Sequence, residues 1–138
     1  MLLTTVAAVF MQAALAQDSW QSYSKTSEME INYRYAECHD NANGIHKSIV
    51  LLQFVNLTGN HLSVSFDKKL WYDSGKCFGC DNSPEQHFGL RLSPNQTLTG
   101  SCDDKKTTSL FIFDKMLEVK SSKLVKFELA NIQIIKVQ

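Results

Sequence analysis

The sequence predicts an all-β protein, a single antiparallel β-sandwich of immunoglobulin-like form that is stapled by disulfides. Short segments in which apolar and polar residues alternate are separated by turn-forming residues at intervals of roughly 8–12 residues. No long segment has the periodicity of a helix, and the chain of 138 residues carries 4 cysteines. A small β-barrel is the alternative architecture, since it uses the same kind of strand.

The composition is that of one ordinary globular domain. The chain has 138 residues, of which 43% are hydrophobic and 20% are charged, and domains of about 100–150 residues are the commonest. Its 14 basic residues balance 14 acidic ones. This balance argues against nucleic acid as a partner and against an anionic membrane surface, because both require an excess of positive charge.

The first residues predict a signal peptide over residues 1–16. No side chain from Met1 to Gln17 is charged, and the apolar run ends in the Ala-x-Ala pattern Ala14-Leu15-Ala16. The run is shorter than the roughly 20 apolar residues that a membrane span requires. We therefore expect an exported protein, periplasmic or extracellular, with no membrane span. Residues 17–28 are polar and predict a flexible lead-in, and residues 29–138 predict the β-sandwich domain.

A hairpin is the strongest local prediction. Residues 49–57 are nearly all apolar, residues 62–66 alternate, and Gly59-Asn60 between them suits a two-residue turn. This turn predicts a register that pairs Leu57 with Leu62, Val55 with Val64 and Gln53 with Phe66. Both strands would then direct their apolar side chains to one face.

The other strands follow from the same alternation. They are predicted at residues 30–35, 88–92, 97–102, 110–113 and 124–137. In the last segment the apolar residues change parity near Ala130-Asn131, which predicts a β-bulge or a bend. Residues 114–122 fit either one helical turn capped by Asp114 or an extension of the preceding strand.

The cysteines Cys38, Cys77, Cys80 and Cys102 predict a disulfide framework, because their number is even and the chain is expected to be exported. The spacing alone does not choose among the possible pairings. Chain entropy favours tying the cysteines of the long loop 73–84 to Cys38 and Cys102. An internal bridge between Cys77 and Cys80 is also geometrically possible.

The motif Cys77-x-x-Cys80 offers two functional interpretations besides a structural bridge. A redox pair is normally placed at a helix N-terminus, but Gly, Asp, Asn and Pro mark this segment as a loop. A metal site would add His39 or His87 to these cysteines, but no second close pair of cysteines is present. Structural disulfides are therefore the favoured interpretation, and no cofactor is expected.

Three segments resemble small exported proteins of Gram-negative bacteria. They are YAECHD at 35–40, VSFDKKLWY at 64–72 and CFGCDN at 77–82. The resemblance implies export and a β-fold but no activity. It also makes the two glycosylation sequons, at Asn56 and Asn95, incidental.

These observations favour a non-catalytic binding or structural module whose partner is another protein or an envelope polymer. Trp71, Tyr72 and Phe78 lie near the cysteine loop and form the candidate contact patch, because aromatic residues dominate interface energetics. A metal-binding or thiol-redox protein that uses Cys77 and Cys80 is the first alternative. A small secreted hydrolase is the second, although the chain has no Gly-x-Ser-x-Gly motif.

Overall fold

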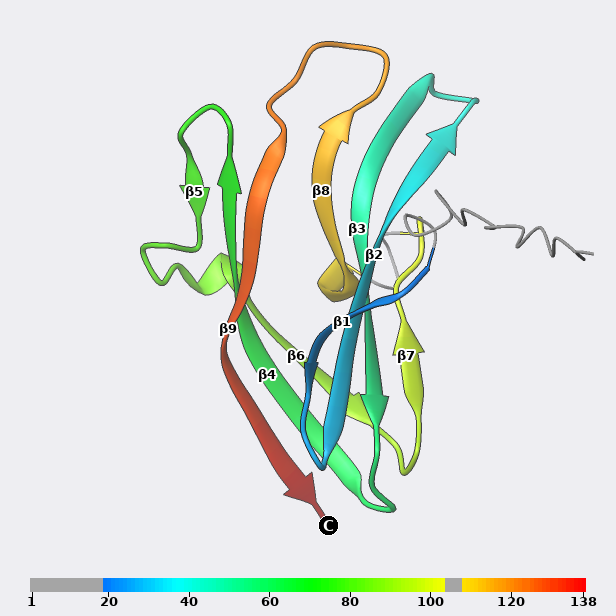
Figure 1. The fold of residues 1–138 in the computed structure, drawn as a ribbon, viewed down its shortest axis with the longest axis vertical. Coiled ribbons are helices and arrows are strands. Elements are labelled where there is room, and N and C mark those ends of the chain that lie inside the picture. Colours follow the sequence, from blue (N-terminus) through cyan, green and yellow to red (C-terminus); the bar gives the residue numbers. More distant parts are fainter. Residues whose placement is uncertain (1–18, 104–107) are drawn as a thin grey trace, which may run out of the picture.

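The computed structural model describes residues 19–103 and 108–138, and these residues form nine strands and two short 3-10 helices (Figure 1). The predicted signal peptide lies outside the described residues. The strands are β1 (Gln21–Lys25), β2 (Met29–Asp40), β3 (Ile45–Asn56), β4 (His61–Tyr72), β5 (Cys77–Phe78), β6 (His87–Leu92), β7 (Thr97–Thr99), β8 (Phe111–Met116) and β9 (Leu124–Val137). The helices are η1 (Pro84–Gln86) and η2 (Thr108–Leu110).

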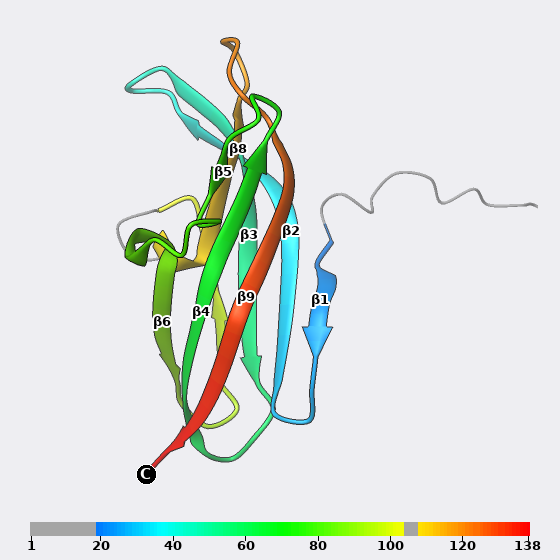
Figure 2. The same ribbon diagram turned by 90° about the vertical axis from the view of Figure 1, so that its left-hand side faces the viewer.

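The strands form two antiparallel sheets that face each other, as the side view shows (Figure 2). One sheet has the order β1-β2-β3-β7 with β8 also on β3, and the other has the order β5-β4-β6 with β9 also on β4. The chain passes from the first sheet to the second between β3 and β4, returns between β6 and β7, and crosses again between β8 and β9. The structure is an antiparallel sandwich built almost entirely of strands, so the predicted all-β fold class is confirmed.

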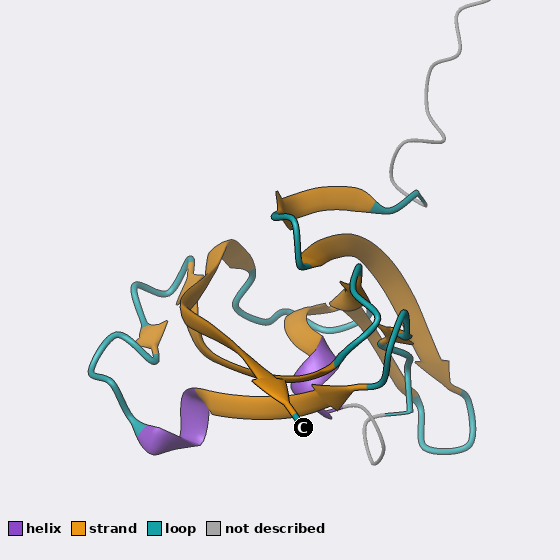
Figure 3. Ribbon diagram, turned by 90° about the horizontal axis from the view of Figure 1, so that it is seen from below, coloured by secondary structure: helices purple, strands orange, loops and turns teal. Residues whose placement is uncertain are grey.

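The core is apolar and lies between the two sheets, whose strands are seen from below in Figure 3. Phe54 of β3 stacks on Phe66 of β4, with ring centroids 5.2 Å apart. Along β4 every second side chain faces inward, as the alternating pattern predicts: Leu62, Val64, Phe66, Lys68, Leu70 and Tyr72 are buried. Each apolar side chain of this size stabilises the fold by about 1.5–3 kcal/mol when it is fully buried.

The predicted hairpin between residues 49–57 and 62–66 is wrong in its pairing. Both strands exist, but β3 and β4 belong to opposite sheets. The buried residues at the end of β3 include Phe54 and Asn56, whereas Leu57 is exposed. The predicted pairs of Leu57 with Leu62 and of Val55 with Val64 therefore do not form.

The side chain of Asn56 explains why the chain crosses between the sheets here. Its Nδ2 donates to the carbonyl oxygens of Asn60 (2.7 Å) and Ser93 (2.9 Å), and its Oδ1 accepts from Thr58. Gly59 does not adopt the positive φ that a primed hairpin turn requires. Asn56 thus holds an open loop instead of a tight turn, and a side chain used in this way is not free to carry a glycan.

The predicted lead-in over residues 17–28 is also corrected, because residues 21–25 form β1 and pair with β2. Tyr23 anchors this strand. Its hydroxyl accepts from the backbone N–H of Leu129 at 2.9 Å, and its ring stacks on Phe127 at 5.8 Å. A polar edge strand has little apolar alternation, which explains why the sequence did not predict it.

The parity change in the last strand is confirmed as a bulge. The register between β4 and β9 shifts between Ser65 and Asp67, and Asn131 adopts a φ of 53°. Asn131 donates from Nδ2 to Asp67 Oδ2 at 2.8 Å, which fixes the bulge against β4.

The disulfides join Cys38 to Cys102 and Cys77 to Cys80, with Cα–Cα distances of 5.6 Å and 5.8 Å. Chain entropy favoured bridges from Cys77 and Cys80 to Cys38 and Cys102, and this expectation is wrong. The internal bridge between Cys77 and Cys80, which was also geometrically possible, is the one that forms. Between Cys77 and Cys80, Gly79 (φ 83°) packs against β4, where a Cβ would overlap the carbonyl oxygen of Lys68. Disulfides of this kind are typical of exported proteins. No helix among the described residues is long and apolar enough to cross a membrane.

Candidate ligand-binding site

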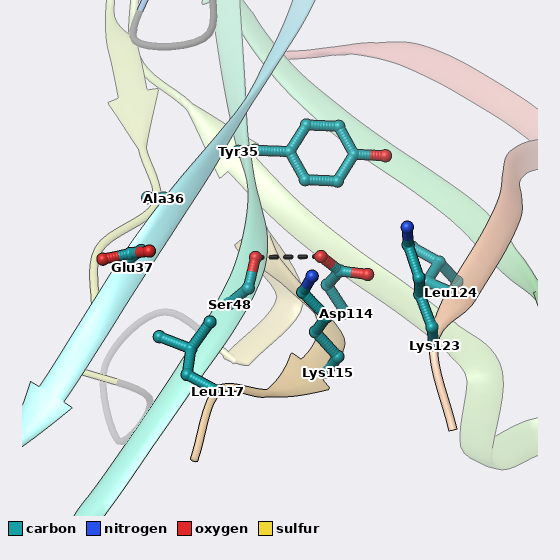
Figure 4. Close-up of a pocket in the computed structure, with 9 residues that line it drawn as sticks. All are labelled: Tyr35, Ala36, Glu37, Ser48, Asp114, Lys115, Leu117, Lys123 and Leu124. Carbon is teal, nitrogen blue, oxygen red and sulfur yellow. Dashed lines mark hydrogen bonds between the residues drawn. The ribbon is translucent and has the colours of Figure 1, made fainter. Parts of the chain in front are cut away.

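A cavity of about 600 Å³ opens between the first sheet and the beginning of β9 (Figure 4). Strand β2 contributes residues 35–37, β3 contributes Ser48, and β8 contributes Asp114 and Lys115. Leu117, Lys123 and Leu124 complete the wall. The site is therefore assembled from segments far apart in the sequence.

Asp114 lies at a β-bulge in this wall. Ile49 pairs with Phe113 and Ser48 pairs with Lys115, so Asp114 is the extra residue of β8. Bulges redirect side chains and occur frequently beside functional sites. Asp114 is directed inward, and only 4% of its surface is exposed.

The carboxylate of Asp114 has one oxygen that is bonded and one that is not. Oδ2 accepts a hydrogen bond from the Ser48 hydroxyl at 2.8 Å. Oδ1 is buried and has no hydrogen-bond partner within the described ranges 19–103 and 108–138. In Figure 4 the unbonded oxygen points away from Ser48, toward the side where Lys123 and Leu124 lie. Leaving a buried acceptor without a donor costs about 1–3 kcal/mol, and more for a charged group.

Two tyrosines near Asp114 have raised pKa values. Burial raises the pKa of Tyr72 to about 12, and the negative charge of Asp114 adds to this effect. Burial, followed by the same charge, raises the pKa of Tyr35. Both phenols are thus protonated donors at neutral pH. Tyr72 donates to the carbonyl of Phe113 at 2.6 Å, whereas the hydroxyl of Tyr35 has no partner in the described part of the chain.

Charged side chains surround the mouth of the cavity. Glu37 and Lys123 are exposed, and Lys115 is half-buried. In the part of the chain that the structure describes, neither lysine has a carboxylate oxygen within 4.0 Å. These cations are therefore available to a ligand.

No relative contributes to the interpretation of this site. Comparisons with protein-family models, curated proteins and solved structures find no match to this chain. The side chains themselves provide one buried carboxylate, two hydroxyls and three charged groups at the mouth. Convergent polar groups in a concave site suit the binding of a small polar molecule.

The predicted aromatic patch is only partly assembled. Tyr72 and Phe78 meet edge to face at 5.7 Å, and they line a second cavity of about 500 Å³ together with Leu70 and Phe113. Trp71 lies on the opposite face of β4, where Lys126 Nζ is 4.7 Å from its ring centroid. Neighbouring residues of a strand point to opposite faces, so the three aromatic side chains do not form one surface.

The residues considered for a metal site lie apart. His39 on β2 has its Nδ1 2.8 Å from Nδ1 of His46, and His87 on β6 in the other sheet has its Nδ1 2.6 Å from Asp67 Oδ1. Cys77 and Cys80 are bonded to each other. The described residues contain no group of three or more His, Cys, Asp or Glu side chains arranged to hold a metal ion.

Sequence reasoning did not identify Ser48, Asp114 or Tyr35 as site residues. Of the two structures considered for residues 114–122, the strand extension is confirmed by β8. One signal was present: Asp114 has the same parity as Ile112, so a continued strand directs a charged residue toward the core. A charge at a core position is costly and is therefore a candidate for function.

Proposed function

We propose that this protein is an exported, non-catalytic binding module that holds a polar group of its ligand in the Asp114 cavity. The ligand is a small molecule, or a group displayed on a partner protein or an envelope polymer. The observation that carries this proposal is the buried Asp114 Oδ1, which has no hydrogen-bond partner among the described residues although it lies beside a cavity. A ligand that supplies a donor would remove this cost.

Export is supported by the two disulfides and by the apolar N-terminus that ends in Ala-x-Ala. Disulfides form and persist in the periplasm and outside the cell, whereas cytosolic thiols are kept reduced. The periplasm or the extracellular space is therefore the proposed location.

A binding role is favoured over hydrolysis because no activated nucleophile is visible in residues 19–103 and 108–138. In the cavity, Ser48 donates its proton to a carboxylate and contacts no imidazole. The pair formed by His87 and Asp67 lies elsewhere, on the exposed outer side of β4 and β6. No hydroxyl in the described part of the chain is hydrogen-bonded to His87, and an activated serine requires such a contact.

A ligand screen tests the proposal. The full chain is expressed, and the exported ¹⁵N-labelled protein is purified and mixed with a library of small polar molecules. We expect at least one compound to raise the melting midpoint and to shift the backbone amide signals of Ser48 and Asp114. Asp114→Asn should abolish this binding, whereas Glu85→Gln, which removes an exposed carboxylate on η1, should leave it unchanged. A screen without such a compound, or a compound that binds Asp114→Asn equally well, would refute the proposal.

A thiol-redox role is a second candidate, favoured by the exposed position of Cys80 in the short bridge to Cys77. Exposed disulfides are the labile ones in many redox proteins. Equilibration with glutathione, followed by alkylation and mass measurement, tests this role. Reduction of Cys77–Cys80 at the potential of a glutathione buffer, with Cys38–Cys102 intact, would support it. Equal resistance of both bridges would exclude it.

A further inference from the structure

The charges of the Asp114 cavity are arranged by depth. Asp114 and Ser48 are buried and form the floor. Lys115, Lys123 and Glu37 are more exposed and form the mouth. The floor is thus negative, and the two lysines and one glutamate give the mouth an excess of positive charge.

The floor requires a hydrogen-bond donor. Asp114 Oδ1 has no donor among the described residues, and the Ser48 oxygen, which already donates to Oδ2, keeps lone pairs that accept. The χ2 torsion of aspartate is broad, so a small rotation turns Oδ1 into the cavity. Hydrogen bonds in which the donor or the acceptor is ionised are about twice as strong as those between neutral groups. An ammonium group, with three N–H donors, matches these acceptors best.

The mouth requires an anion. Lys115 and Lys123 both line the cavity, and neither has a carboxylate partner within the described residues. Lysine binds carboxylate and phosphate groups as a mobile point charge. A ligand that only carried a cation would leave this pair of lysines unused, and a simple anion would be repelled by Asp114.

We infer that the cavity binds a small zwitterion, with its ammonium group on Asp114 and Ser48 and its anionic group between Lys115 and Lys123. The inference rests on the proposed function, because it names the ligand class of the same cavity. A volume of about 600 Å³ accommodates such a molecule. Tyr35 also lines the cavity, and its hydroxyl is a further hydrogen-bonding group for the ligand.

Four probes of similar size separate the charge requirements: β-alanine carries both charges, propylamine only the cation, propionate only the anion, and glycerol neither. Each probe is titrated at neutral pH into the exported ¹⁵N-labelled protein. We expect β-alanine to shift the amide signals of Asp114 and Ser48 with a Kd at least about tenfold lower than that of the other three probes.

Two variants localise the effect. Asp114→Asn should weaken β-alanine binding by about tenfold or more. The Lys123 side chain is exposed, so we expect Lys123→Gln to fold normally and to keep the test valid if Asp114→Asn folds poorly. It should bring the affinity for β-alanine close to that for propylamine. Glu85→Gln serves as the control and should change neither affinity.

The outcomes distinguish this inference from the proposed function. If propylamine, propionate or glycerol bound at the same amides as tightly as β-alanine, the zwitterion would be refuted, but the cavity would remain a binding site. If no probe shifted these amides, the zwitterion would also be refuted. The proposed function would fail as well if the wider library produced no ligand, or if its ligands bound Asp114→Asn equally well.

Discussion

Lys68 is a buried lysine in the middle of the inward-facing row of β4, with 3% of its surface exposed. Its Nζ donates to the carbonyl oxygen of Phe111 at 2.9 Å and lies 4.1 Å from the centroid of the Phe88 ring. Burial disfavours the charged form and lowers the pKa of Lys68 from 10.5 to about 7.

This shift predicts a pH-dependent stability. Between about pH 7 and the ordinary pKa of 10.5, the unfolded chain binds more protons at Lys68 than the folded protein does. The free energy of unfolding should therefore rise with pH across this window, by up to about 1.4 kcal/mol per pH unit. Lys68→Met should remove the rise. Urea unfolding of both proteins at several pH values measures it, and parallel pH profiles would contradict the assignment.

The buried carboxylate of Asp114 is expected to lower the stability of the fold while it serves ligand binding. Asn at this position keeps an acceptor for Ser48 and removes the negative charge from the core. We expect Asp114→Asn to raise the free energy of unfolding by about 1 kcal/mol while ligand binding is lost. Chemical unfolding without ligand measures the change. A large loss of stability would show that the carboxylate serves the fold and not a ligand.

At the scale of the element, Tyr23 joins the two sheets. Its hydroxyl accepts from the N–H of Leu129 and donates to the carbonyl of the same residue at 3.4 Å. Tyr23→Phe should therefore lower the free energy of unfolding by about 1–3 kcal/mol, because a half-buried N–H loses its partner. Tyr33→Phe is the matched control, since the Tyr33 hydroxyl donates to the exposed Gln21 side chain at 2.8 Å. Equal effects of the two changes in urea unfolding would contradict the bridging role.

The strands show what alternation predicts and what it does not. A period of two residues specifies which face of a strand is buried, so the inward row of β4 and the bulge at Asn131 were predictable. It does not specify the partner strand. The crossing after β3 depends on hydrogen bonds that Asn56 donates to the carbonyl oxygens of Asn60 and Ser93, and Ser93 lies 37 positions further along the chain.

The candidate site was less predictable than the fold for a similar reason. Asp114 acquires its environment from β2, from the segment before β9 and from the Ser48 hydroxyl on β3, which is 66 positions away in the chain. The prediction of an aromatic patch is wrong at Trp71, because adjacent positions of a strand face opposite sides of the sheet. Composition and spacing describe residues one at a time, whereas a site depends on where the strands bring them.

At the scale of the whole molecule, the two disulfides should contribute unequally. Cys38–Cys102 closes a loop with a sequence separation of 64, and Cys77–Cys80 closes one with a separation of 3. Chain entropy assigns about 4 kcal/mol to the first bridge and about 2 kcal/mol to the second. The difference arises in the unfolded state, where the longer loop restricts many more conformations.

Paired variants test this ranking, because replacing both cysteines of a bridge leaves no free thiol. We expect the double variant Cys38→Ser, Cys102→Ser to lose clearly more free energy of unfolding than the double variant Cys77→Ser, Cys80→Ser. The first bridge also covers Ile49 and Leu51 in a small second apolar cluster, which adds to its effect. Intact mass before and after reduction confirms that the remaining bridge has formed in each variant. A larger loss from the Cys77 and Cys80 pair would mean that their loop, packed through Gly79 against β4, stabilises the second sheet more than chain entropy predicts.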